Sequence, residues 1–241
     1  MSIDPASAVM AAAPLSSIAA GPGEPPEDCP LCPRLAAYRA ELRTLHPDWY
    51  NAPVPPFGDP EAWLAIVGLS PAMKGGNRTG RVFTGEKGGA LVYETLLAMA
   101  LAEGDYGARA DDGLVLDGVT MIDAVRCVPP NNQPTRVEAR TCRPFLEAPL
   151  AALPELRVVI ALGEDAHRSA VKALGGKLPK ARFGHLAEHR FPNGVRLLDS
   201  RHPTELQDGA PVLTAEMFEA VIARALVLRA EEPTGALRSP E

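Results

Sequence analysis

The sequence predicts an α/β fold of three layers, α/β/α, in which helices cover both faces of a mostly parallel central sheet. Three observations predict it: apolar runs of strand length, a helical pattern after each run, and glycine-rich polar loops between them. A strand followed by a helix, four times over, is typical of a parallel sheet, because parallel strands need a crossover connection. A chain of 241 residues, 46% of them hydrophobic, can bury one substantial core.

Each predicted strand is a short apolar run, and each predicted helix follows one of these runs. The strands are expected at residues 64–69, 119–125, 158–162 and 195–199. The helices are expected at residues 90–102, 136–153, 165–174 and 214–229. The last helix has a favourable start, because Thr214 occupies an N-cap position and Glu216 places a carboxylate in the first turn.

The two ends of the chain differ in composition from its middle. Residues 1–27 are rich in Pro, Ala and Gly without periodicity, which predicts a disordered leader. Residues 28–229 form the predicted single domain, and residues 230–241 a flexible tail. The leader begins without Lys or Arg and contains Asp4, so it fits a secretory signal poorly, and no stretch resembles a membrane span. We therefore expect a cytoplasmic protein, and nothing indicates a membrane or protein partner.

The charge distribution leaves room for one local basic surface. A net charge of −6 argues against a generally basic coat but does not exclude a basic face. The most basic stretch has His185 and His189 among its cations, which are Lys172, Lys177, Lys180, Arg182 and Arg190. Such a stretch is a candidate for salt-dependent contacts with phosphates, and the alternative is an ordinary solvated hairpin. His46 and His167 are expected at the surface, as are the two histidines of the basic stretch.

The most informative stretch is the glycine-dense loop at residues 68–86, which follows an apolar run and carries two arginines, an asparagine, Phe83 and Glu86. Loops at the carboxyl end of a strand are where α/β sheets bind ligands, and glycines let backbone N–H groups come close. The spacing of Gly80 and Gly85 suits a phosphate-binding loop. That motif needs lysine where Glu86 stands, and a glutamate would repel phosphate. The loop therefore predicts a ligand site of another kind.

Four cysteines form two pairs, Cys29 with Cys32 and Cys127 with Cys142, and none is left over. Four thiolates can close a zinc site or hold a four-iron cluster, and the spacing does not separate these two. A redox C-x2-C is disfavoured because the motif follows a predicted disordered leader and not a strand. Four unrelated buried thiols are the remaining alternative. A shared site would tie the N-terminal arm to the central domain.

Three motifs resemble those of family 5 uracil-DNA glycosylases. Gly68-Leu-Ser-Pro-Ala, with Gly76-Asn-Arg-Thr-Gly-Arg and Phe83-Thr-Gly, resembles the first motif of that family. Arg126-Cys-Val-Pro-Pro-Asn-Asn looks like its central motif, and Ser200-Arg-His-Pro-Thr resembles its C-terminal motif. The likeness covers residues 28–229 in the correct order. It implies a three-layer enzyme that flips uracil out of DNA and excises it, with hypoxanthine and other deaminated bases as further candidates.

The same resemblance implies roles for individual residues. Three residues would take part in catalysis: Glu86 near the water, Asn132 at the base or the water, and His202 at the leaving group. The ring of Phe83 would stack on the flipped base. Other implied or inferred substrate contacts are Gly68, Ser70, Asn77, Arg78, Asp123 and Leu206, the last as an apolar wedge. The four cysteines would hold a [4Fe–4S] cluster.

Three positions depart from the pattern of the related families. Glu86 stands where family 5 usually has aspartate, which moves the carboxylate by about 1.5 Å. A misplacement of about 1 Å can cost about a hundredfold in rate. Gln207 replaces the usual asparagine after the C-terminal motif. Asp123 stands where family 4 has an asparagine that reads uracil, and a carboxylate there would accept protons from a purine or reject the carbonyls of uracil.

Each functional interpretation has a simpler alternative. Glu86 could be a solvated charge, His202 could end a strand, Asn132 could be a turn residue, and Phe83 could anchor its loop in the core. At the level of the whole protein, one alternative is a metal-stabilised nucleic-acid binder that has lost catalysis. Another is an α/β enzyme for small molecules that uses zinc for stability.

Overall fold

The computed structural model describes residues 23–204 and 212–231, and a six-stranded sheet forms its centre. The strand order is β1-β5-β2-β6-β8-β7. The four inner strands are parallel, and they are β5 (Val119–Asp123), β2 (Leu64–Gly68), β6 (Val158–Leu162) and β8 (Arg196–Ser200). The edge strands β1 (Phe57–Gly58) and β7 (Glu188–Arg190) pair antiparallel. The predicted, mostly parallel sheet is confirmed.

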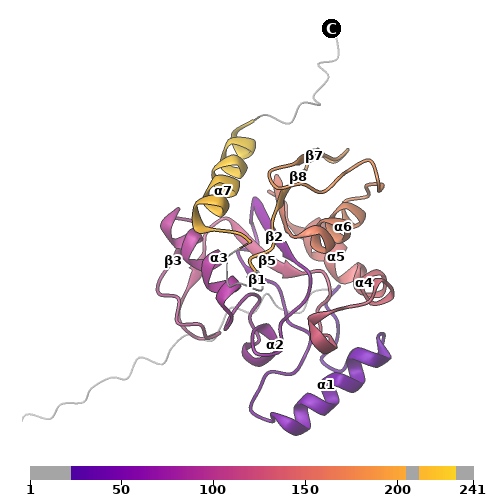
Figure 1. The fold of residues 1–241 in the computed structure, drawn as a ribbon. Helices are drawn as coiled ribbons and strands as arrows, with labels where there is room; N and C mark the ends of the chain where they lie inside the picture. Colours follow the sequence, from indigo (N-terminus) through magenta and orange to yellow (C-terminus); the bar gives the residue numbers. More distant parts are fainter. Residues whose placement is uncertain (1–22, 205–211, 232–241) are drawn as a thin grey trace, which may run out of the picture.

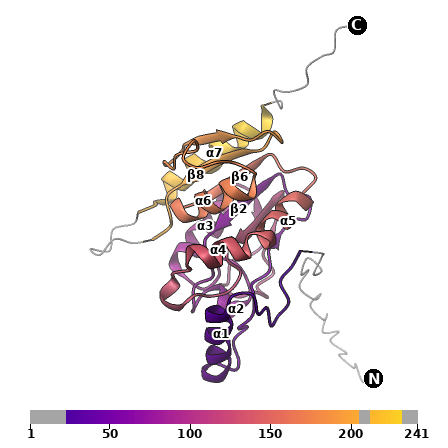
Figure 2. The same cartoon turned by 90° about the vertical axis from the view of Figure 1, so that its right-hand side faces the viewer.

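Helices cover both faces of this sheet (Figures 1 and 2). One face packs against α3 (Lys87–Ala98) and α7 (Ala215–Ala230), the other against α5 (Pro144–Ala152) and α6 (Glu164–Ala173). Successive strand residues point to opposite faces, so Ile66 joins the first core cluster and Val67 the second. Because both faces are covered, the strands are apolar throughout, which is the signal that predicted them.

Two predicted helices need comment. The helix expected at residues 136–153 is two helices, α4 (Arg136–Cys142) and α5, which meet at Arg143. Pro144 begins α5 and has no backbone N–H to continue the earlier hydrogen-bond ladder, so the chain starts a new helix there. The start of α7 agrees with the sequence, since the Thr214 hydroxyl accepts a hydrogen bond from the Met217 N–H at 3.2 Å.

Several short elements and one long helix have no counterpart in the prediction. The short ones are the edge strands β1 and β7, α2 (Gly76–Thr79), β3 (Ala102–Glu103), β4 (Val115–Leu116) and the 3-10 turn Pro130–Asn132. The long one is α1 (Pro33–Leu45), which buries Leu35, Arg39 and Leu42. Its buried face includes an arginine, so the apolar spacing that marks an amphipathic helix is broken.

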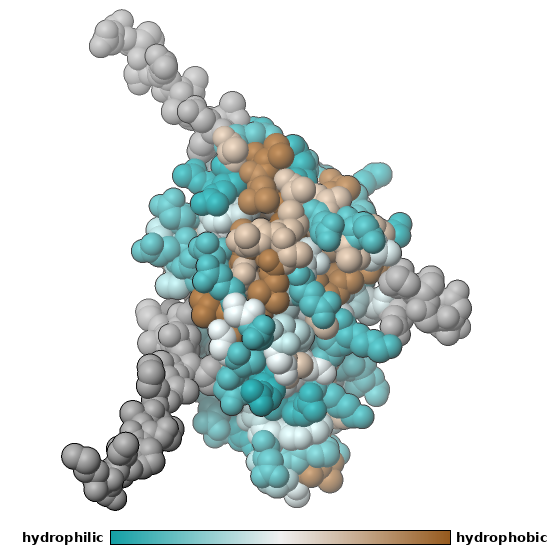
Figure 3. All heavy atoms as spheres, turned by 90° about the vertical axis from the view of Figure 1, so that its left-hand side faces the viewer, coloured by the Kyte–Doolittle hydropathy of each residue, from teal (hydrophilic) through white to brown (hydrophobic). Residues whose placement is uncertain are grey.

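The side of the molecule formed by α3 and α7 carries a hydrophobic band between hydrophilic regions (Figure 3). Hydrophobic side chains of these helices that keep some exposure include Leu91, Leu97 and Val227. No helix within residues 23–204 and 212–231 is long and apolar enough to cross a membrane.

The predicted boundaries at the termini stay predictions. Residues 1–22 and 232–241 lie outside the described residues, as do Leu206 and Gln207. Glu24, which the prediction placed in the leader, forms an ion pair at 2.5 Å with the fully buried Arg126. Helix α7 ends at Ala230, close to the predicted start of the tail.

Candidate active site

The residues predicted for the site gather at the carboxyl ends of the parallel strands. Gly68 ends β2, Asp123 ends β5, and His202 follows the end of β8. Gly163 follows β6, and a Cβ atom there would lie 3.1 Å from the Cβ of His202. This edge of a parallel sheet is where α/β proteins bind their ligands.

Gly68 lets two functional side chains approach the same point. A Cβ at this position would lie 2.4 Å from Oδ1 of Asp123 and 2.6 Å from Cζ of Phe83, so only glycine fits. Phe83 has a φ of 54° and is 9% exposed, and it belongs to the core cluster on the α3 side. The ring of Phe83 therefore anchors its loop in the core and presents one edge toward Asp123.

The first turn of α3 brings the Phe83 loop and the His202 segment together. A Cβ at Gly89 would lie 1.6 Å from the carbonyl oxygen of Phe83, and a Cβ at Gly88 would lie 2.2 Å from that of Pro203. Both chain segments therefore touch the helix where it has no side chains. Two motifs that are more than a hundred residues apart in sequence meet at this helix start.

Asp123 is buried without a partner for one of its oxygens. The residue is 1% exposed, and its Oδ1 is the buried side-chain nitrogen or oxygen atom that makes no hydrogen bond within the described part of the chain. Burial and then the charge of Glu86 raise the pKa of Asp123 to about 8, while the charge of Arg126 opposes them. The carboxyl group is therefore largely protonated at neutral pH.

Glu86 and His202 also lack side-chain hydrogen bonds to other described residues. Glu86 is the N-cap residue of α3, and its Oε1 lies 3.1 Å from where a Cβ of Gly75 would be. Both residues keep exposed surface, yet the protein around them desolvates their charged forms. Desolvation raises the pKa of the Glu86 carboxyl and lowers the pKa of the His202 imidazole, so His202 is neutral at pH 7.

The other predicted contact residues are placed less centrally. Ser70 is half-buried after β2, and Arg78 is exposed with its Nη2 beside Gly85. Asn77 is 1% exposed and donates its side-chain N–H to Oδ1 of Asn51 at 2.9 Å, so this side chain supports the loop. Asn132 is exposed with a φ of 55°, and its hydrogen bond runs from its backbone N–H to Pro129 O at 3.1 Å.

Arg81 is a supporting residue that the sequence analysis missed. It is 3% exposed, and its guanidinium donates to both oxygens of Asp112, at 2.7 and 2.6 Å. The same group lies 5.0 Å from the ring centroids of Phe57 and Tyr93. Arg81 thus fixes the loop that carries Phe83 to the segment around Asp112. Its signal in the sequence is weak, because the ion partner is about thirty residues away.

Comparison with known families decides the relationship of the chain. The family description "Uracil DNA glycosylase superfamily" matches residues 55–225. The chain belongs to the uracil-DNA glycosylase superfamily. A type-5 uracil-DNA glycosylase of Thermus thermophilus is 42% identical over 202 residues, which are 82% of this chain and 92% of that protein. One of Pyrobaculum aerophilum is 38% identical over 82% of this chain and 88% of its own length. The resemblance to family 5 is confirmed.

In this glycosylase-superfamily protein the four cysteines line one small cavity beneath α1. Cys29, Cys127 and Cys142 are buried and Cys32 is half-buried, and all four are free thiols. Arg39 donates to Sγ of Cys127 at 3.5 Å and to the carbonyl of Cys29 at 3.0 Å. Such donors suit sulfur atoms that carry negative charge. The predicted meeting of the two cysteine pairs is therefore seen.

The spacing of the sulfur atoms bears on what they could hold. Among the described residues, no three of these sulfurs lie within 4.8 Å of one another. Zinc bound by four thiolates at about 2.3 Å would hold its sulfurs about 3.8 Å apart. A four-iron cluster binds one thiolate at each iron and spreads its ligands more widely. Sulfur atoms more widely spaced than a bound zinc ion would hold them leave room for a four-iron cluster.

His167 corrects a prediction, because it is buried and not at the surface. It is 1% exposed, its Nδ1 lies 2.7 Å from Oδ1 of Asp199, and its Nε2 lies 3.1 Å from the carbonyl of Ala181. Nε2 of His189 lies 3.2 Å from Oδ2 of the same aspartate. We call His167, His189 and Asp199 the Asp199 cluster. His167 lies on the buried face of α6 beside Ala166 and Ala170, and the segment containing Ala181 covers it.

The predicted basic stretch is partly available to a ligand. Lys177, Lys180 and Arg182 are exposed, whereas Lys172 is half-buried on α6. Arg190 lies 3.9 Å from Glu231. Arg182 lines an open hollow with Arg168, Pro179 and Phe183. Phosphate binding by this stretch stays a prediction.

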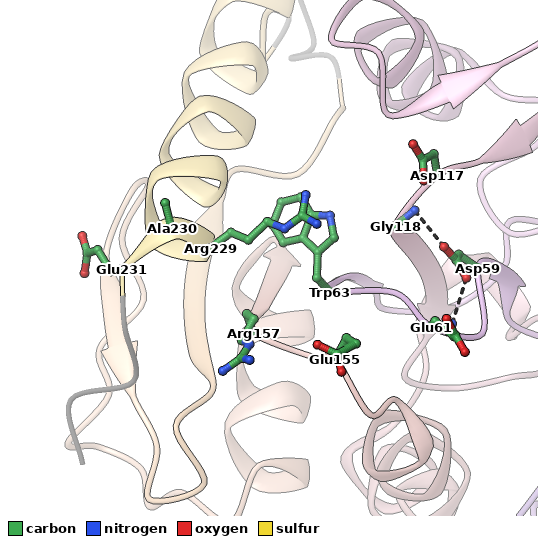
Figure 4. Close-up of a pocket in the computed structure, with 10 residues that line it drawn as sticks. All are labelled: Asp59, Glu61, Trp63, Asp117, Gly118, Glu155, Arg157, Arg229, Ala230 and Glu231. Atoms are coloured by element: carbon green, nitrogen blue, oxygen red, sulfur yellow. Dashed lines mark hydrogen bonds between the residues drawn. The ribbon is translucent and has the colours of Figure 1, made fainter. Parts of the chain in front are cut away.

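Another hollow lies at the opposite edge of the sheet, at the amino ends of β2, β5 and β6 (Figure 4). Arg229 stacks over the ring of Trp63 there, at 4.7 Å from its centroid. Carboxylates outnumber guanidinium groups in the lining, which includes Asp59, Glu61, Asp117, Glu155, Glu231, Arg157 and Arg229. This acidic surface would repel DNA phosphates, so the nucleic acid should approach the carboxyl ends of the strands.

Proposed function

We propose that this protein is a DNA-repair enzyme that hydrolyses the N-glycosidic bond of uracil in DNA and leaves an abasic site. The observation that carries the proposal is the identity of 36–42% to type-5 uracil-DNA glycosylases over about four fifths of the chain. The meeting of the Phe83 loop, Asp123 and the His202 segment at one edge of the sheet supports it. A binder without catalysis is the less favoured alternative.

The first step is extrusion of the target nucleotide, because no side chain reaches a base inside the stack. Unstacking costs a few kcal/mol. Stacking of the base on the ring of Phe83 would return part of this, since such contacts contribute about 1–3 kcal/mol per base. Leu206 as an apolar wedge lies outside the described residues and stays a prediction.

Cleavage then develops negative charge on the departing base and positive charge on the sugar. The C1′–N bond breaks with its electron pair leaving on the base, and the water oxygen bonds to C1′. Neutral His202 would donate a hydrogen bond to a base oxygen, and the loss of such a donor costs about 10²–10³ in rate. Glu86 would orient the water, take its proton and stabilise the cationic sugar. Asn132 stays a candidate for contact with the base or the water.

DNA affinity would come from local groups of cations. Arg78 lies on the active-site loop, and Lys177, Lys180 and Arg182 lie on the exposed basic stretch. Such contacts release counterions and give binding that falls steeply with salt. The net charge of −6 makes this local arrangement necessary, because the protein as a whole repels DNA.

We also propose that Cys29, Cys32, Cys127 and Cys142 hold a [4Fe–4S] cluster with a structural role. Burial raises the pKa of Cys142 to about 12, so this thiol stays protonated unless a metal binds it. The cluster would fix α1 to the central motif that follows β5. The purified protein should be brown and absorb visible light, whereas a zinc protein is colourless. Cys127→Ser should lose the colour and lower stability, and a well-folded, colourless, fully active variant would contradict the assignment.

An excision assay tests the central proposal. Oligonucleotides with a single uracil should be converted to abasic sites, which alkali then cleaves, and the matched thymine oligonucleotide should not. A protein that shifts the uracil oligonucleotide in a gel but never creates an abasic site is a binder. A panel with hypoxanthine and other deaminated bases defines the range of substrates. A cytoplasmic location, in which the thiols stay reduced, remains a prediction.

A further inference from the structure

Leu186 combines two features that are seldom found in one residue. It is a large apolar residue that is 40% exposed, and its φ of 63° lies in the left-handed region. Bulky residues rarely adopt this region, because the side chain crowds the backbone there. Among the described residues, the other large apolar side chain with a positive φ is Phe83, which is proposed to stack on the base. Strained backbone is common at functional sites, so the position of Leu186 points to a function.

The turn that carries Leu186 would be less strained with a glycine in its place. Residues 184–187 form a turn closed by a hydrogen bond from the Ala187 N–H to the carbonyl of Gly184, at 2.7 Å. Leu186 is the third residue of this turn, where a positive φ favours glycine or asparagine. Its side chain belongs to none of the three hydrophobic clusters found among the described residues. Packing in those clusters therefore does not explain a leucine at this position.

The turn lies at the same edge of the sheet as the candidate active site. Strand β7 runs antiparallel to β8, so the residues just before β7 lie beside the carboxyl end of β8. The Leu186 N–H donates to the carbonyl of Asp199 at 2.8 Å, and the Arg201 N–H donates to Nδ1 of His185 at 3.3 Å. His202 follows Arg201 directly in the chain. Leu186 is therefore held near the residue proposed to stabilise the departing base.

The turn is fixed to β8 and has cations on both sides. The Gly184 N–H donates to Oδ2 of Asp199 at 3.3 Å, and the Asp199 N–H donates to the carbonyl of Ala187 at 2.9 Å. Arg182 precedes the turn by two residues, Arg201 is bonded to it through its backbone, and both arginines are exposed. An exposed apolar side chain between cations suits DNA, in which phosphates flank apolar sugar and base surfaces.

We propose that Leu186 contacts duplex DNA and packs against the base pair next to the extruded nucleotide. Extrusion opens a gap in the stack and uncovers base surface, which an apolar side chain can cover. The inference rests on the proposed function and adds a residue that makes extrusion from a duplex less costly. Leu186 precedes β8, whereas Leu206 follows the His202 motif, so this contact is separate from the wedge that the resemblance implies.

The proposal predicts a loss of rate on duplex DNA only. A nucleotide in a single strand has no pairing to break and costs least to unstack. In single-turnover assays, Leu186→Ala should slow uracil excision from a duplex at least about fivefold, and change the rate on the single strand of the same sequence by less than about twofold. Leu186→Met keeps a large apolar side chain and should retain the duplex rate.

A glycine variant separates contact with DNA from a role in the fold. Glycine adopts a positive φ without strain, so Leu186→Gly should unfold at a urea concentration no lower than the wild type. It should still lose the duplex rate as Leu186→Ala does. The matched control is Val227→Ala, because Val227 is 51% exposed near the end of α7. Arg229, two residues later, lines the hollow at the opposite edge of the sheet, so both rates of this control should follow the wild type.

A fluorescent base tests the same contact without cleavage. Aminopurine placed beside the uracil brightens when its stacking is broken, and the rise on binding the duplex should be smaller for Leu186→Ala than for the wild type. Equal losses of rate on the duplex and the single strand, or no loss on either, would overturn the inference and leave the proposed function intact. If the wild type releases uracil from neither substrate, the proposed function fails. An equal rise in fluorescence for the two proteins would then overturn the inference as well, and a smaller rise for Leu186→Ala would support it.

Discussion

Two clusters of polar side chains at the carboxyl ends of the parallel strands differ in whether their polar atoms have hydrogen-bond partners. The Asp199 cluster is closed: both oxygens of Asp199 have histidine partners, and the aspartate is 0% exposed. The second group, Glu86, Asp123 and His202, we call the Asp123 group. Its side chains make no hydrogen bonds to one another, and Asp123 keeps a buried oxygen free within the described residues.

The histidines of the two groups show what this difference means. Burial opposes the charge of His167, but the hydrogen bond and charge of Asp199 outweigh it and raise the pKa of His167. Desolvation without a partner lowers the pKa of His202. Side chains that satisfy one another stabilise the fold, whereas side chains left without partners are available for a ligand. The same residue types therefore form a closed structural cluster in one place and stay available for a ligand in the other.

The largest expected effect is on the closed group. Asp199→Asn removes the charge that the buried His167 and the half-buried His189 face, and breaking a buried pair costs about 3–5 kcal/mol. Because the folded pKa of His167 is raised, the loss should be greatest below about pH 6.5 and shrink as the pH rises through the folded pKa. Urea denaturation measures it, with Asp105→Asn as control. A change no larger than the control would show that the cluster does not stabilise the fold.

The open group should respond in activity and not in stability. His202→Ala should slow uracil excision by about 10²–10³, because it removes the donor to the departing base. Its free energy of unfolding and its DNA affinity should stay close to wild type, since His202 supports no other described side chain. Single-turnover rates and gel-shift titrations separate the two quantities. Equal losses of rate and affinity would contradict the role at the leaving group.

The stability of the protein should also report the protonation of Asp123. Its folded pKa lies above its unfolded value, so the native state binds a proton that the unfolded chain releases. Raising the pH from 6 to 7 should therefore destabilise the wild type by about 1.4 kcal/mol relative to Asp123→Asn. Denaturation curves of both proteins at the two pH values measure this difference. Equal changes in the free energy of unfolding would mean that Asp123 is ionised in the folded state.

The smallest effect concerns the coupling inside the open group. The charge of Glu86 is the second cause of the raised pKa of Asp123, after burial. Glu86→Gln should therefore lower the folded pKa of Asp123 by less than about one unit, so that the native state loses this proton at a lower pH. Denaturation curves of the wild type and the variant between pH 6 and pH 9 measure the change. The same pH dependence of stability in both proteins would show that the two carboxyl groups do not interact.

The sheet could be predicted from the sequence because its strands are covered on both faces. The runs at β2, β5, β6 and β8 are continuous and apolar, and that pattern depends only on local composition. The glycine loop was also predictable as a ligand site, since Gly68 gives access to Asp123 and Phe83. Local sequence contains both signals.

The rest depends on partners that are far away along the chain. The buried face of α1 includes Arg39, whose guanidinium donates to the carbonyl of Cys29 and to Sγ of Cys127, 88 residues later. His167 is buried because its two ring nitrogens form hydrogen bonds with Asp199 and with the carbonyl of Ala181. Arg81 supports its loop through Asp112. Each is a charged or polar residue whose burial requires a distant counterpart, so its own neighbourhood in the sequence suggests a surface position.

The ion pair of Glu24 with Arg126 has a practical consequence for anyone who shortens this protein for crystallisation. Composition suggests trimming the chain at residue 28, just before the first cysteine. That cut would remove the only carboxylate bonded to the guanidinium within residues 23–204 and 212–231, at the segment that leads from β5 to Cys127. A shortened protein should therefore start ahead of Glu24, so that the base of the four-cysteine corner keeps its counter-charge.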